Sequence, residues 1–474
     1  MPNPSFTPRR IDLTIAALIG TTLLLAWPRH AHGQSVASAR IATPPAAPET
    51  TTVTPAAPTP APAPSAALPV PIVFSGEIRT RSEWDRPGGA VAADAFTYLR
   101  TRFGARIDAA PGARIVLQLQ DSRVLGAEGN TTTTAPDVFD LHQGYVELSA
   151  PWRGIGLGVR AGRQEIALAN ERLVGPVGWS NTGRSFDGAR LMLAPANAKP
   201  GAEPWTATLF GATVEERGRR FGATPATDKA PDHAVAGLFV TRALPGRGAL
   251  EATALYDGGA RYRAYDDANR ATLDARLRSP RLLGVSAELE GAWQTGSQRY
   301  VPADTTLMPR GQRVRAWLVG ARLGTPSATP ARRASAALGV DVLSGDAAPG
   351  DGRYGAFSTM FATNHPFYGL MDLFTDPAAR TKDRGLVDAL ATSSVALDPA
   401  VTLRADLHHF SLAAGDTRPL GWEGDLILPV RVSGAAAVEL GYTLFLAERA
   451  APLAGLGASG TTRHWAYLQL RAGF

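Results

Sequence analysis

Arginine recurs at every second position in two neighbouring segments of the chain, around residues 80 and 100. Five arginines share this spacing: Arg79, Arg81, Arg100, Arg102 and Arg106. A guanidinium group presents a planar fork of donors that matches a carboxylate or a phosphate. If the five lie on one face, they could form several weak sites along which an anionic solute moves. A structural network with Glu77, Glu83 and Asp108 is an equally open interpretation.

The sequence gives little support for covalent catalysis or metal binding. The chain has no cysteine, which excludes disulfides, thiolate ligands and a cysteine nucleophile. It contains no Gly-x-Ser-x-Gly, Gly-Lys-Ser/Thr, His-Glu-x-x-His or EF-hand pattern. His408 and His409 are adjacent, so on a strand they point to opposite faces and cannot bind one ion together. His365 belongs to a different segment, and we expect no catalytic residue, no metal and no cofactor.

The first 72 residues indicate export rather than a folded domain. Arg9 and Arg10 precede an apolar run of about 15 residues, and Ala31-His32-Gly33 then has the spacing of a signal-peptidase site. This run is too short to cross a bilayer comfortably. Residues 34–72 are rich in Pro, Ala and Thr, a composition typical of an extended linker. We predict a signal peptide at 1–33 and a disordered periplasmic linker at 34–72.

Residues 73–474 alternate between apolar and polar side chains with a period of two, which predicts strands with one apolar and one polar face. Eighteen strands are expected, at 73–85, 96–108, 113–122, 140–149, 155–164, 187–194, 204–215, 233–242, 249–256, 270–278, 283–295, 313–324, 332–345, 384–397, 400–413, 423–433, 435–450 and 463–474. Alternation alone fits a soluble sandwich as well as a membrane barrel.

The lengths of the connections favour the membrane barrel. Connections after even-numbered strands are mostly short, as at 109–112 and 150–154, whereas 165–186 and 346–383, after odd-numbered strands, are long. Short turns at one end and long loops at the other are typical of outer-membrane proteins. We therefore predict an all-β, antiparallel transmembrane barrel of about 18 strands, with short periplasmic turns and long extracellular loops.

The last strand ends on an aromatic residue. Phe474 shares an apolar face with Ala472, Leu470 and Leu468, an arrangement that resembles the C-terminal signal of bacterial outer-membrane barrels. We expect Phe474 to be the assembly signal and the cell outer membrane to be the location. The expected partners are outer-membrane lipid, the barrel-assembly machinery and, for an exporter, periplasmic export proteins; no nucleic acid is expected.

A second group of charged residues lies in or beside the long connection after the fifth predicted strand. Its members are Arg163, Glu165, Arg172, Arg184 and Asp187. In general porins the third extracellular loop folds inward and narrows the pore, so these residues could form a constriction. The alternative is a loop held by its own Arg–acid pairs, which the comparable numbers of the two charge types favour.

Several short segments resemble the signature of the bacterial alginate export family. They are Gly162-Arg163-Gln164-Glu165, Arg172-Leu173-Val174-Gly175, Trp179, Arg184-Ser185-Phe186-Asp187-Gly188, Asn364-His365-Pro366-Phe367-Tyr368-Gly369, Asp372-Leu373-Phe374, and His408-His409 before Phe410. The resemblance covers about residues 73–474. It implies an eighteen-stranded outer-membrane barrel, and the best-known members pass an anionic uronic-acid polymer through an Arg-lined lumen.

The sequence thus predicts an outer-membrane channel for an anionic or polyhydroxylated solute, such as a polysaccharide, and not an enzyme. A general porin for small anions or sugars is the alternative within transport. A barrel-embedded hydrolase is a third interpretation, for which no convincing set of catalytic residues can be named.

Overall fold

The computed structural model describes residues 70–474 except 89–91, 127–137, 197–203, 216–232, 263–264, 283, 302–307, 326–332, 349, 416–417 and 449–460. The predicted signal peptide and nearly all of the predicted linker lie outside the described residues. Within them, no helix is long and apolar enough to cross a membrane.

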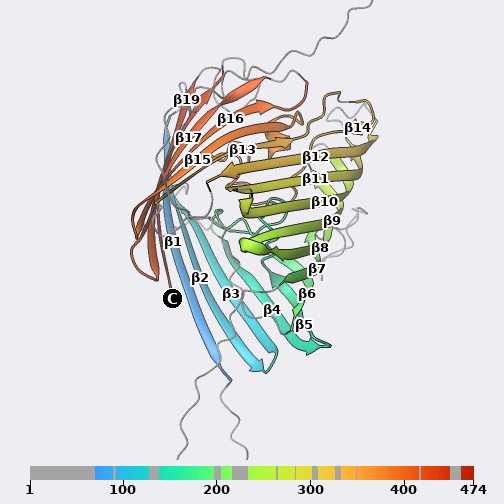
Figure 1. Cartoon of the computed structure of the whole chain (residues 1–474), viewed down its shortest axis with the longest axis vertical. Helices are drawn as coiled ribbons and strands as arrows, with labels where there is room; N and C mark the ends of the chain where they lie inside the picture. The colour runs from blue at the N-terminus through green and yellow to red at the C-terminus, as the bar shows by residue number, and fades with distance from the viewer. Residues whose placement is uncertain are drawn as a thin grey trace, which may run out of the picture.

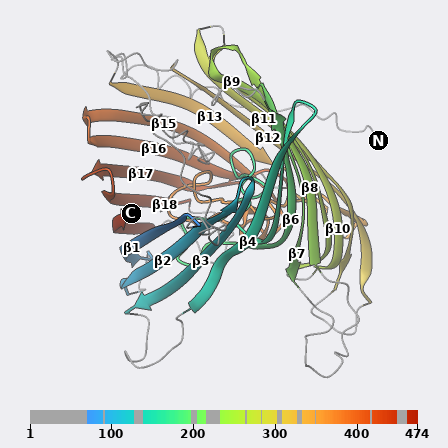
Figure 2. The same cartoon turned by 90° about the horizontal axis from the view of Figure 1, so that it is seen from below.

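Eighteen antiparallel strands form a closed barrel in which each strand pairs with the next, and β1 pairs with β19 to close the ring (Figures 1 and 2). The first nine are β1 (Ile72–Arg86), β2 (Asp94–Ala110), β3 (Ala113–Leu125), β4 (Val138–Trp152), β5 (Ile155–Gln164), β6 (Phe186–Pro195), β7 (Trp205–Glu215), β8 (His233–Leu244) and β9 (Gly248–Tyr262). The others are β10 (Tyr265–Leu282), β11 (Val285–Tyr300), β12 (Arg310–Gly324), β13 (Ala334–Leu343), β15 (Leu386–Asp398), β16 (Val401–Leu412), β17 (Pro419–Arg431), β18 (Ala436–Ala447) and β19 (Thr462–Gly473). The predicted fold is confirmed, and each predicted strand corresponds to one of these.

The connections alternate in length as the sequence predicts. Residues 111–112, 153–154 and 399–400 are tight turns at one end, whereas 165–185 and 344–385 are long connections at the other. One connection differs, because β9 and β10 extend until only residues 263–264 separate them. Residues 257–269 are polar or small on both faces, so the sequence pattern gives no sign that these strands continue there.

The barrel closes where its first strand meets its last strand. The amide of Phe474 donates to the carbonyl of Gly76 at 3.1 Å, and the amide of Gly76 donates back at 3.2 Å. The Phe474 ring is 81% exposed and lies against Gly76, where a side chain larger than hydrogen would collide with it. The terminal aromatic therefore stays accessible on the folded barrel.

A short strand, β14 (Arg353–Tyr354), completes the wall beside β12. β13 pairs only with Leu318–Gly324, so the other half of β12 has no partner from β13. There β14 pairs in parallel with Arg313 and Val314. The remaining short elements are the 3-10 turn η1 (Pro245–Arg247) and the helix α2 (Pro377–Arg380), which Asp376 caps by accepting from the amide of Ala379.

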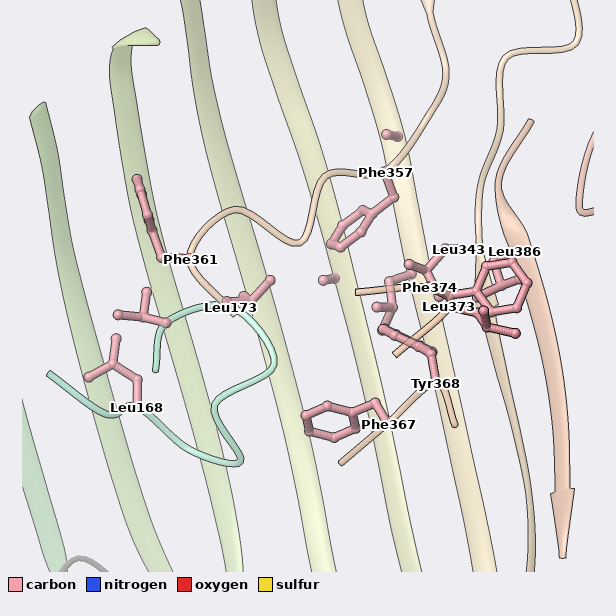
Figure 3. Packing of buried hydrophobic residues seen from close by; sticks show 14 of the residues in the cluster. Leu168, Leu173, Leu343, Phe357, Phe361, Phe367, Tyr368, Leu373, Phe374 and Leu386 are labelled. Carbon is pink, nitrogen blue, oxygen red and sulfur yellow. The ribbon is translucent and has the colours of Figure 1, made fainter. Parts of the chain in front are cut away.

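Two long connections fold into the barrel, and we call them inner loop A (residues 165–185) and inner loop B (residues 344–385). They meet in a parallel bridge between Val174 and Phe361. Figure 3 shows Leu168 and Leu173 of loop A near Phe361 of loop B, in front of the strands. Their apolar side chains form a core with inward residues of the wall, among them Phe410 and Phe445. The barrel thus has an apolar core inside its lumen.

Candidate functional site: the channel interior

Three of the predicted lumen arginines hold inner loop A against the wall. Arg79 donates to the carbonyls of Gly178 and Ser180, at 2.7 and 2.8 Å. Arg100 donates to the same two carbonyls at 3.2 and 3.1 Å, and Arg81 reaches that of Trp179 at 2.7 Å. All three arginines are at most 4% exposed. The three guanidinium groups therefore bind the loop, which favours a structural role for them over a path for solute.

Carboxylates of β1 complete the environment of these arginines. Glu77 accepts from Arg100 at 2.7 Å, and Glu83 accepts from Arg81 at 2.7 Å. The Arg81 guanidinium lies 3.8 Å from the ring centre of Trp179, which stacks on His365 of inner loop B at 4.0 Å. A cation over an indole face is an additional attraction. This end of loop A is thus fixed by hydrogen bonds, charge and stacking together.

The other end of inner loop A is fixed to the opposite wall by Arg172. This side chain is 1% exposed and forms ion pairs with Glu290 of β11 at 3.0 Å and Asp341 of β13 at 3.1 Å. Burial alone would lower the pKa of Arg172, but the two carboxylates raise it above its ordinary value, so the residue stays charged. The loop therefore spans the lumen, from β1 and β2 on one side to β11 and β13 on the other.

Arg184 joins the two inner loops. Its guanidinium donates to the carbonyls of Gly175, Phe361 and Ala362, so it bridges loops A and B without a carboxylate partner among the described residues. Burial lowers the pKa of Arg184 to about 10, which still leaves it charged at neutral pH. The two loops are therefore one cross-linked unit.

Two further predicted residues form another contact between loop and wall. Glu165, the first residue of loop A, accepts from Arg102 at 3.3 Å and lies 2.7 Å from Nε2 of His142. Burial would raise the pKa of Glu165, but His142 and Arg102 lower it below its ordinary value. Arg163 and Asp187 lie outside this network and form an exposed pair at 2.8 Å. Of the predicted loop group, Glu165 and Arg172 bind inner loop A to the wall and Arg184 joins the two inner loops, whereas Arg163 and Asp187 do neither.

The last of the five predicted arginines, Arg106, belongs to a different arrangement on the inner wall. Direct cross-strand neighbours form a row over five strands: Asp108, Arg114, Glu147, Arg160 and Arg190. We call this row, together with Arg106, the basic row. Within it two carboxylates pair with three of the four arginines: Asp108 pairs with Arg106 and Arg114, and Glu147 pairs with Arg114 and Arg160. Positive charge is therefore in excess.

Sequence reasoning did not single out Arg114, Glu147, Arg160 and Arg190. Each occupies a polar position of a strand, which is a weak signal by itself. The row appears only once the register of five strands is known, because its members are up to 84 residues apart in the chain, from Arg106 to Arg190. Alternation gives the face of each side chain but not its height in the barrel.

Acidic residues gather on the facing wall, between β9 and β17. The buried carboxylates there are Glu251, Asp257, Asp274, Glu290, Asp341, Asp388, Asp406, Glu423 and Asp425. Inner loop B covers two of them: Glu423 accepts from the amide of Met371 at 2.9 Å, and Asp425 from that of Leu370 at 3.4 Å. By contrast, the side chains of Arg106 and Arg114 in the basic row are 43% and 28% exposed. A solute therefore meets the basic wall more openly than the acidic one.

The histidines serve as packing and pairing groups. His408 is buried and lies 2.9 Å from Asp388, while His409 faces the other side of β16 and packs on Trp422. His365 pairs with Asp372 at 2.8 Å. Among the described residues no three His, Asp or Glu side chains are arranged to hold a metal ion.

The geometry of a closed barrel with two inner loops agrees with a family comparison. The model of the alginate export family, described as "Alginate export", matches residues 71–421. The chain belongs to this family. The match includes both inner loops and the basic row. No curated protein matches the sequence of this alginate export family member.

Solved outer-membrane channels resemble this alginate export family member in fold. OccK2 (OpdF) of Pseudomonas aeruginosa aligns with a TM-score of 0.54 at 14% identity, over 85% of this chain and 97% of that one. OccAB1 of Acinetobacter baumannii gives 0.52 at 10% identity, over 85% and 97%. A BenF-like porin of Pseudomonas fluorescens Pf-5 gives 0.52 at 10% identity, over 85% and 99%. Family and fold together support a channel of the outer membrane.

Proposed function

We propose that this channel passes solutes that carry carboxylate groups, and that the basic row selects them. The observation that carries the proposal is the unequal access to the two walls. The basic row has more guanidinium groups than carboxylates and is partly exposed, whereas most acids of the facing wall are buried, two of them under inner loop B.

The chemistry of the row suits transport better than tight binding. Each of its carboxylates is shared by two arginines, so the arginines keep unused donors that face the lumen. A passing carboxylate can exchange from one guanidinium to the next, and several weak sites allow both entry and release. The row extends from beside the turn at 111–112 to the middle of β6, so its arginines are spread over five strands of the wall.

Two structural neighbours support this class of solute. A structure of OccK2 is described as a complex with glucuronate, and it aligns with a TM-score of 0.54 at 13% identity. OpdK is described with vanillate, at a TM-score of 0.51 and 11% identity. Both ligands are carboxylates. Family membership adds a second candidate, a uronic-acid polymer passing as a single extended chain.

The test measures the reversal potential, and from it the ion selectivity, of the channel in a planar bilayer under a salt gradient. Arg106→Ser with Arg190→Ser removes two positive charges while Asp108 keeps Arg114 and Glu147 keeps Arg160. We expect the wild type to prefer anions and the double variant to shift its reversal potential toward cations. The shift should shrink as salt rises, because the Debye length falls from about 10 Å at 0.1 M to about 3 Å at 1 M.

A matched control is Arg313→Ser with Arg315→Ser, which removes the same charge from the outward face of β12. Its reversal potential should stay that of the wild type. An Arg106/Arg190 variant that folds and keeps wild-type selectivity would overturn the proposal. A second readout, block of the current by added glucuronate, should weaken in the same variant.

A further inference from the structure

Three exposed arginines lie close together on the outside of the barrel, on β12 and β14. Arg313 and Arg315 are exposed on β12, where they alternate with the buried Gln312, Val314 and Ala316. Arg353 of β14 is exposed and lies beside Arg313 in the parallel register. Since the buried members of the alternation face the lumen side, these three guanidinium groups face outward.

These arginines have no carboxylate partner among the described residues. In this they differ from the arginines of the inner wall, most of which form ion pairs or bind loop carbonyls. They stand at the start of β12, which comes after the connection at 301–309. That end of the barrel carries the long loops and is extracellular in outer-membrane proteins. The three charges therefore meet the outer leaflet at its headgroup level.

An apolar hollow lies directly below these arginines on the same outward face. Its volume is about 400 Å³, and its walls include Leu273, Trp293, Trp317 and Val319. Trp293 and Trp317 are direct cross-strand neighbours, and Gly291 beside them leaves the floor without a side chain. Trp317 is two residues from Arg315 along β12, which is about 7 Å. An acyl chain in the hollow would thus place its headgroup among the guanidinium groups.

We propose that this surface binds a phosphorylated, acylated glycolipid of the outer leaflet, of the lipid A type. Its phosphates accept from Arg313, Arg315 and Arg353, and one acyl chain occupies the hollow between Trp293 and Trp317. Arginine suits this role because its planar fork matches phosphate oxygens. The tryptophans mark the depth at which the apolar band of the wall ends.

The experiment titrates purified protein in detergent with diphosphoryl lipid A, and counts bound lipid by native mass spectrometry. Lipid A from which both phosphates have been removed is the comparison. The wild type should half-saturate at about a tenfold lower concentration of the phosphorylated lipid. Arg313→Ser with Arg315→Ser should lose this difference while keeping heat-modifiable migration. Equal binding of the two lipids by the wild type would overturn the proposal, and this arm requires no variant.

Two further variants test the binding of the phosphate headgroup and the binding of the acyl chain separately. Arg242→Ser with Arg431→Ser removes exposed arginines from the opposite end of the barrel and should leave the phosphate preference intact. Loss of the preference there too would mean a general effect of charge, which contradicts the proposed site. Trp317→Ala should weaken the binding of both lipids. Unchanged binding after that substitution would show that the hollow holds no acyl chain.

Discussion

At the scale of single residues, one side chain type performs three different tasks in this barrel. Arg79, Arg81 and Arg100 bind backbone carbonyls of an inner loop, whereas Arg114 and its neighbours share carboxylates on the open wall. Arg315 faces outward with no described acidic partner. What an arginine does here is therefore decided by what lies opposite it, not by its own spacing.

Arg172 gives the sharpest prediction at this scale. After Arg172→Met, the remaining hydrogen-bond donor to Glu290 among the described residues is the side-chain amide of Asn170. Asp341 keeps its ion pair with Arg322. Breaking a buried ion pair from one side costs about 3 kcal/mol or more. We expect inner loop A to detach locally, which single-channel recording would register as a noisier and larger open current.

Arg163→Ser is the matched control for Arg172. The Arg163–Asp187 pair is exposed, and such pairs contribute less than about 1 kcal/mol. Its current should resemble that of the wild type. Equal noise in the two variants would show that the buried pairs of Arg172 do not hold the loop.

The ionisation of Glu165 leads us to predict that the stability of inner loop A depends on pH. Its pKa in the folded protein lies below its ordinary value of 4.5, so its contribution to loop stability is present above that pH. The contribution is lost as the pH falls through the folded pKa. Open-channel noise should therefore rise as the solution is made acidic, at a pH below the ordinary pKa of a glutamate. Glu165→Gln should be noisy already at neutral pH and change less in acid; a pH response identical to the wild type would contradict the assignment.

At the scale of elements, the strands can be predicted from the sequence, but the contacts that hold the inner loops to the wall cannot. Alternation places Arg79, Arg100 and Arg106 correctly on one face, since a strand has only two faces to choose from. The carbonyls that Arg79 binds belong to Gly178 and Ser180, about a hundred residues later. Backbone acceptors carry no mark in the sequence, so this contact could not be predicted.

We expect that the anion selectivity of the channel does not depend on inner loop A. Deleting residues 177–182 removes the segment that Arg79, Arg81 and Arg100 hold, but leaves the basic row in place. We expect a larger conductance with anion preference retained, measured in the same bilayer experiment. A deletion that abolishes the preference would mean that the selective groups belong to the loop rather than to the wall.

At the scale of the whole molecule, closure of the barrel depends on the pairing of its first and last strands. β19 pairs with β1 over Glu77 to Arg86, and Phe474 extends that pairing to Gly76. Deleting Phe474 should lower the amount of protein in the outer membrane, measured by fractionation and by the fraction with heat-modifiable migration. Wild-type levels after this deletion would show that the exposed terminal ring is not an assembly signal.

The two-residue strand β14 has a consequence for anyone who wishes to convert this barrel into a wide, open nanopore. Part of inner loop B is also wall, since Arg313 donates from its amide to Gly352 and β14 lies along β12 where β13 is too short to reach. Excising the whole of residues 344–385 would open a slit in the cylinder. A sensor built on this scaffold must keep the segment around 352–354 and confine any deletion to the part of loop B on its C-terminal side.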